Sequence, residues 1–132
     1  MSKSYDNAID IFMETEKKLQ KRCNKIVSSS TPLGEALEYE GCNIYNLASL
    51  FLDENQKIEL QKRYATGEEG YGHFKQYLKT LIWDEFAEAR EKRDYYLNNP
   101  DIVRDILNDG ATKMRLIADE KIKKIRNAIG IL

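Results

Sequence analysis

Apolar residues recur at helical spacing along most of the chain, and the longest unbroken pattern covers residues 70–99. Good helix formers fill this stretch, and Pro100 directly after it makes continuation costly. We predict one long helix here, with a buried first half and a solvated second half that begins after Ala89. The stripe expected to face the core consists of Phe74, Leu78, Leu81, Ile82, Phe86 and Ala89.

Shorter amphipathic segments with capping residues at their ends surround the long pattern. Asn43 and Asp53 stand where N-caps belong, and Gly67 is placed to end a helix. The turn signal Asn108-Asp109-Gly110 is expected to interrupt the last apolar pattern, or only to kink the helix there. The helices predicted in addition to the long one cover residues 14–27, 44–51, 54–66, 100–107 and 111–129.

Strand patterns are almost absent and the connections are short, so the predicted fold class is all-α, a helical bundle with one long central helix. We divide the chain into a loop segment at 1–13 and a helical domain at 14–132. Outside the long helix, the residues expected to face the core are Leu19, Cys23, Ile26, Val27, Leu47, Leu50, Phe51, Ile58, Leu60, Tyr64, Ile102, Val103, Ile106 and Leu107.

Composition and charge exclude several classes of function. The net charge of -1, with 33% of residues charged, argues against a protein that holds nucleic acid by bulk positive charge, so any such contact must be local. No apolar run is long enough to span a membrane, and the start lacks the apolar core of a signal peptide, so we predict a cytoplasmic location. Cys23, Cys42 and the lone His73 supply too few ligands for a zinc or iron–sulfur site, and no metal site is predicted.

The first residues carry a different kind of signal. Met1-Ser2-Lys3-Ser4 is similar to the KMSKS signature of class I aminoacyl-tRNA synthetases, with the first lysine of the signature falling before Met1. The chain also resembles one family, the bacterial-type tryptophanyl-tRNA synthetases, along almost its whole length. That resemblance is carried by 5–9, 30–32, 41–45, 70–75, 90–95, Asn99-Pro100 and the ending at Gly130. The chain departs from the family at 28–30, where the family often has Thr-Asp-Ser.

The resemblance implies the C-terminal portion of such an enzyme, starting inside the signature. The parent enzyme, expected to be a homodimer, uses ATP with magnesium to attach tryptophan to tryptophan tRNA. By this resemblance Lys3 is the catalytic residue, because a lysine on a short polar loop neutralises the charge that grows on the departing pyrophosphate. Ser2, Lys3 and Ser4 are then expected to contact the ATP phosphates, and only beside the missing nucleotide-binding domain.

The chain by itself is expected to be catalytically inert. It has no strand-loop-helix glycine motif for a nucleotide, and only one histidine where the parent family has a His-Ile-Gly-His-like motif. We therefore predict no cofactor bound to the chain alone, and a monomer, since dimerisation in the parent resembles a property of the missing domain. For Lys3 alone, the plainer interpretation is a solvated lysine on a flexible N-terminal tail.

Basic and aromatic residues in the second half of the chain are candidates for RNA contact. The resemblance implies an anticodon-recognition domain, and anticodon bases are bound by stacking and edge hydrogen bonds, with phosphate contacts from Lys and Arg. The candidate tRNA-binding residues are Arg90, Arg93, Tyr95, Tyr96, Lys121 and Lys124. Two alternatives stay open: a free-standing helical RNA-binding or regulatory relative without catalysis, and a structural interaction module whose basic faces are only solvated.

Overall fold

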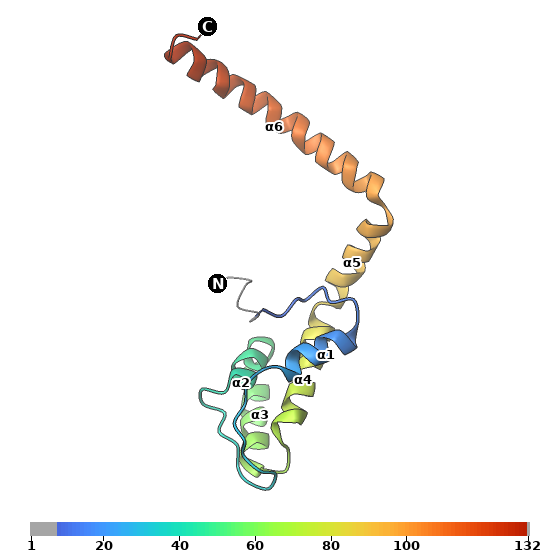
Figure 1. Ribbon diagram of the computed structural model, residues 1–132, viewed down its shortest axis with the longest axis vertical. Coiled ribbons are helices and arrows are strands. Elements are labelled where there is room, and N and C mark those ends of the chain that lie inside the picture. Colours follow the sequence, from blue (N-terminus) through green and yellow to red (C-terminus); the bar gives the residue numbers. More distant parts are fainter. Residues whose placement is uncertain (1–7, 132) are drawn as a thin grey trace. The chain divides into compact units, whose positions relative to one another are not determined.

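The computed structural model describes residues 8–131, and all regular structure among them is helical, so the all-α prediction is confirmed. Figure 1 shows the order of the elements. They are α1 (Glu16–Asn24), α2 (Asn43–Ala48), the 3-10 helix η2 (Ser49–Phe51), α3 (Glu54–Thr66), α4 (Tyr71–Glu85), α5 (Ala87–Asn98) and α6 (Pro100–Ala128). The described residues form two compact units, of which the first ends at Arg90 and the second begins at Glu91.

Helix α4 is the centre of the first unit, and it packs against α1 and α2. Phe74 of α4 stacks on Tyr64 of α3, with ring centroids 3.8 Å apart, which adds α3 to the same core. Lys75 donates to the carbonyl of Asn24, and Lys79 forms an ion pair with Glu16, so both ends of α1 are attached to α4. The buried core residues are Leu19, Cys23, Leu37, Ile44, Ala48, Leu52, Leu60, Tyr64, Phe74, Leu78 and Ile82.

The long loop between α1 and α2 is attached to the C-terminal end of α3. The amide of Gly34 donates to the carbonyl of Gly67 at 2.9 Å, and the amide of Leu37 donates to the carbonyl of Tyr64 at 2.9 Å. Gly67 ends α3 in the left-handed region, with φ 69°. A Cβ at this position would lie 2.8 Å from the backbone of Glu35, so only glycine allows the loop to approach α3 this closely.

The predicted cap of α3 is confirmed, the predicted cap of α2 is shifted by one residue, and α1 is shorter than predicted. Asp53 accepts from the amide of Gln56, and Gln56 accepts from the amide of Asp53, in a capping box. Helix α1 begins two residues later than predicted because Thr15 caps it, and it ends three residues earlier than predicted, at Asn24. Cys42, and not Asn43, is the N-cap of α2.

The prediction of one helix over 70–99 is wrong, because the helix breaks at Phe86. The backbone of Phe86 leaves helical geometry, with φ -98° and ψ 18°, and its ring packs edge-on against Phe51 at 6.3 Å. The guanidinium of Arg90 lies 3.8 Å from the centre of the Trp83 ring and donates to the Trp83 carbonyl. Tertiary packing of one aromatic ring and one arginine thus outweighs the local helix propensity.

In the second unit, the last helix is longer than predicted. Asn108-Asp109-Gly110 does not interrupt the last helix, and α6 continues for 29 residues, or about 43 Å. One glycine among good helix formers costs only about 1 kcal/mol, which does not end a helix of this length. None of the residues of α5 and α6 is buried, so the inward placement predicted for Ile102, Ile106 and Leu107 is wrong.

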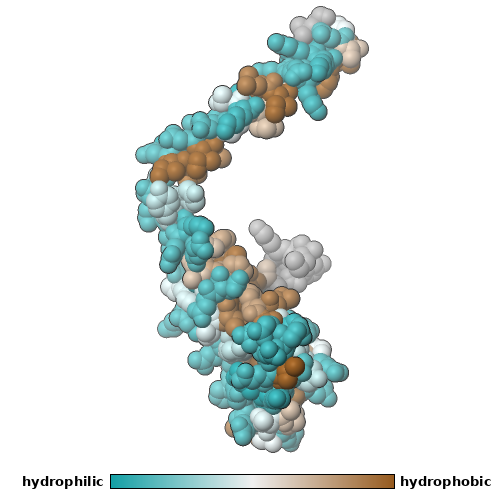
Figure 2. Space-filling view, turned by 180° about the vertical axis from the view of Figure 1, so that it is seen from behind, coloured by the Kyte–Doolittle hydropathy of each residue, from teal (hydrophilic) through white to brown (hydrophobic). Residues whose placement is uncertain are grey.

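Figure 2 shows apolar side chains in bands between charged ones along α6. Three apolar positions of the first unit are also exposed against prediction: Val27, Leu50 and Ile58. None of the described helices is both long enough and apolar enough to cross a membrane.

Candidate functional site

The residues with the catalytic prediction, Ser2, Lys3 and Ser4, lie outside the described residues, so their role stays a prediction. The structure does describe the chain directly after them. The carbonyl of Ala8 accepts a hydrogen bond from Nε of Arg22 in α1 at 2.7 Å. A cavity of about 450 Å³ lies where Ala8 and Ile9 meet α1 and α2. The segment that follows the signature is therefore attached to the helical core.

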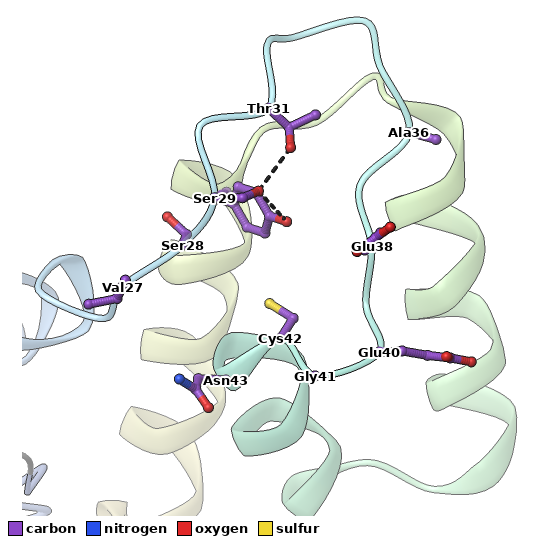
Figure 3. Close-up of a pocket in the computed structure, with 11 residues that line it drawn as sticks. Val27, Ser28, Ser29, Thr31, Ala36, Glu38, Glu40, Gly41, Cys42 and Asn43 are labelled. Atoms are coloured by element: carbon purple, nitrogen blue, oxygen red, sulfur yellow. Dashed lines mark hydrogen bonds between the residues drawn. The ribbon is translucent and has the colours of Figure 1, made fainter.

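A larger cavity of about 610 Å³ lies between two loop segments of the first unit, 27–31 and 36–43 (Figure 3). The loop contacts at Gly34 and Leu37 with the end of α3 hold the second segment in place. Figure 3 shows the Cys42 side chain directed into the space between the segments, whereas that of Glu40 is directed away from it. Tyr71, in the first turn of α4, completes the lining.

Three hydroxyl groups in the lining form a chain of hydrogen bonds. The Ser29 hydroxyl donates to the hydroxyl oxygen of Tyr71 at 3.0 Å, and it lies 2.8 Å from the hydroxyl of Thr31. Because a serine hydroxyl has a single proton, Thr31 is the donor in the second bond. The hydroxyl proton of Tyr71 then takes no part in these two hydrogen bonds.

The charge of the cavity is negative. Glu38 and Glu40 belong to its lining, which contains no lysine, arginine or histidine. The thiol of Cys42 lies 3.9 Å from the hydroxyl of Tyr64, and burial raises the pKa of Tyr64 well above its usual value. Tyr64 is therefore a neutral part of the core, and the groups available to a ligand are hydroxyls, one thiol, one amide and carboxylates.

The structure does not bring the six predicted RNA-binding residues together. The guanidinium of Arg90 is held on Trp83 in the first unit, where its Nη1 is buried without a hydrogen-bond partner among the described residues. Arg93 forms an ion pair with Asp94 at 3.1 Å, and the neighbouring rings of Tyr95 and Tyr96 are exposed and 5.4 Å apart.

The two predicted lysines lie far along the last helix. Lys121 is exposed, and Lys124 forms an exposed ion pair with Glu120 at 2.6 Å. Lys121 lies about 30 Å along α6 from its first residue. The predicted set therefore divides into an arginine that stabilises the fold, a polar and aromatic group on α5, and a separate basic region on α6.

The larger cavity is not predicted by the sequence. Its lining comes from loop segments, and loops have no apolar periodicity that reveals which residues converge. The only sequence signal was the polar run at 28–30, where the chain departs from the family it resembles. Nothing in that run indicates that Ser29 contacts Tyr71, 42 residues further along the chain.

Comparison with known proteins extends this description. The chain is 52% identical over 131 residues to a tryptophan–tRNA ligase of Campylobacter jejuni, covering 99% of this chain and 41% of that protein. It is 42% identical over 132 residues to the tryptophan–tRNA ligase of Fusobacterium nucleatum, covering 100% of this chain and 40% of that protein. A crystal structure of the Campylobacter jejuni tryptophanyl-tRNA synthetase, complexed with ADP and tryptophan, superposes with a TM-score of 0.93 over 98% of this chain. No family model matches the chain.

These matches assign the chain to the aminoacyl-tRNA synthetases, of which it represents a helical C-terminal portion. Its particular family is the bacterial tryptophanyl-tRNA synthetases, which confirms the resemblance noted in the sequence. The chain spans about two fifths of the length of the relatives it matches, 41% of the first and 40% of the second.

Proposed function

We propose that the chain provides the KMSKS-type loop and the anticodon-recognition domain of a tryptophan–tRNA ligase. The whole enzyme activates tryptophan with ATP and transfers it to its tRNA, in the cytoplasm. The observation that carries this proposal is the 52% identity over 99% of the chain to a tryptophan–tRNA ligase. The related structure is a complex with ADP and tryptophan, which supports a nucleotide and tryptophan as ligands of the whole enzyme.

In this proposal Lys3 acts during tryptophan activation. Negative charge grows on the departing pyrophosphate, and a lysine ammonium group beside it lowers the barrier electrostatically. Ser2 and Ser4 offer hydroxyl and amide protons to the same phosphates. The bond between Arg22 and Ala8 supports the proposal, because it fixes the segment that follows this loop to the helical domain.

Magnesium belongs to the proposed reaction of the whole enzyme, and we assign it to no residue described here. The described residues contain no group of three or more histidine, cysteine, aspartate or glutamate side chains that would hold a metal ion. The whole enzyme is proposed to be a homodimer, and the isolated chain a monomer without activity. Pyrophosphate exchange by the isolated chain with tryptophan and ATP would overturn the last point.

Anticodon binding is testable on the chain itself. We expect the folded chain to bind tryptophan tRNA with an affinity that falls as salt rises, because each phosphate contact releases counterions. Arg93→Ala removes one partly exposed cation of α5, and we expect weaker binding with unchanged helicity, as measured by fluorescence anisotropy and circular dichroism. Absence of binding even at low salt would favour a structural interaction module.

A further inference from the structure

The smaller cavity, of about 450 Å³, lies beside Ala8 and Ile9, between the C-terminal end of α1 and the short helix α2. Three residues of its lining, Ile9, Ile26 and Leu47, also pack against the buried core. A cavity of this size, with a mostly apolar lining and a few polar groups, has the usual form of a small-ligand site.

The apolar part of this lining is aliphatic and partly uncovered. Val27 belongs to it and is 83% exposed, although helical periodicity predicts that this residue faces the core. A ligand that covers Val27 removes apolar surface from water, which is favourable. No aromatic ring stands among the described residues of the lining, so it has no surface on which a nucleobase stacks. The lining therefore matches an aliphatic body.

The charged part of the same lining is cationic. Arg22 and Lys25 contribute to it, and the described lining contains no aspartate or glutamate. Arg22 is half-buried, and its Nε donates to the carbonyl of Ala8 at 2.7 Å, which holds the guanidinium at the cavity. Asn43 and Asn46 of α2 add side-chain amides, which donate hydrogen bonds to an anion. A planar guanidinium beside such donors matches a carboxylate.

We propose that this cavity binds a free monocarboxylate with an unbranched aliphatic chain, its carboxylate at Arg22 and Lys25 and its chain over Val27. The binding itself does not depend on the proposed function. An occupant would contact Ala8 and Ile9 as well as α1 and α2, so it would also hold the segment that follows the KMSKS-type loop. Only this consequence for the whole enzyme rests on the proposed function.

The test titrates the 132-residue chain with butanoate, hexanoate and octanoate and follows the methyl signals of Ile9 and Val27 by NMR. We expect the affinity to rise by about 2- to 4-fold for each added methylene group, because each one leaves water. Hexan-1-ol, which has the chain without the charge, should bind at least about 10-fold more weakly than hexanoate. Equal binding of these two would overturn the role of the cations. Methyl signals that octanoate does not shift would overturn the site.

Lys25→Gln and Lys21→Gln form a matched pair of variants, because each removes one exposed positive charge near the end of α1 and only Lys25 belongs to the lining. We expect Lys25→Gln to weaken octanoate binding by about 2- to 5-fold, the range for an exposed ion pair, and Lys21→Gln to leave it unchanged. Equal weakening by the two variants would assign the effect to the general charge of α1 and overturn the carboxylate site.

Val27→Asp and Ile117→Asp distinguish this cavity from the exposed apolar side chains of α6. Both positions are exposed, so we expect both variants to fold, as checked by circular dichroism. Val27→Asp should weaken octanoate binding by at least about 10-fold, because it replaces apolar contact with like charge, whereas Ile117→Asp should not change it. The reverse result would place the ligand on α6 and overturn the site. If Val27→Asp does not fold, the lysine pair decides.

Discussion

Gly67→Ala tests whether close approach of two backbones holds the loop that lines the larger cavity. Placing a residue with a Cβ at φ 69° destabilises the folded state by about 1–2 kcal/mol. Alanine also lowers the conformational entropy of the unfolded chain, which offsets about 0.4–1 kcal/mol of this cost. The added Cβ would also lie 2.8 Å from the Glu35 backbone, and overpacking of this kind costs about 1–3 kcal/mol more. We expect a total loss of about 2–4 kcal/mol in the free energy of unfolding.

Gly41→Ala is the matched control, because Gly41 has φ 73° and no atom within 4 Å of an added Cβ. It should lose only the conformational part, about 1 kcal/mol. Urea unfolding followed by fluorescence of Trp83, the single tryptophan, reports on the first unit in both variants. If Gly67→Ala destabilises the unit no more than Gly41→Ala, close contact between the loop and α3 does not constrain the fold.

Two further substitutions test contacts outside the cavity. Arg90→Ala should destabilise the first unit by about 1–3 kcal/mol in urea unfolding and shift the fluorescence of Trp83, because it removes the stacked guanidinium and its hydrogen bond. Unchanged stability with weaker RNA binding would instead support the RNA-binding role that the sequence predicts for Arg90. The Arg63 guanidinium donates to both carboxylate oxygens of Glu69 at 2.7 Å, and this lowers the pKa of Glu69 below its usual 4.5. The pair therefore stabilises the fold above pH 4.5, and this stabilisation is lost as the pH falls through the lowered pKa. Thermal melts should therefore show Glu69→Gln less stable than the unsubstituted chain at neutral pH, with the difference shrinking as the solution is acidified below pH 4.5, and a pH-independent difference would contradict this.

The sequence predicted best where local chemistry decides the structure. Asp53 and Gly67 mark the ends of α3 because a capping side chain and a left-handed glycine act within a few residues. The stripe of Phe74, Leu78 and Ile82 was equally visible, since helical periodicity places these residues on one face, and all three are buried. Recognition of the family came from motif order along the chain, and the relatives confirm it.

Prediction failed where distant residues decide the structure. The break at Phe86 depends on Phe51, 35 residues earlier, and periodicity does not report such a contact. The apolar residues of α6 have a helical pattern typical of a core-facing helix, yet the pattern does not say what covers them. The larger cavity depends on hydrogen bonds between loop and helix backbones, which carry no side-chain signal in the sequence.

The absence of any buried side chain in α6 has a consequence for cooperativity. A helix that buries nothing has only its own hydrogen bonds and local propensity to hold it, so it opens independently of the core around α4. Amide protons of α6 should exchange with solvent far faster than those of Leu78 and its neighbours. Far-ultraviolet circular dichroism, which counts all helices, will then give a broader transition than Trp83 fluorescence, and the isolated chain will not unfold as one two-state body.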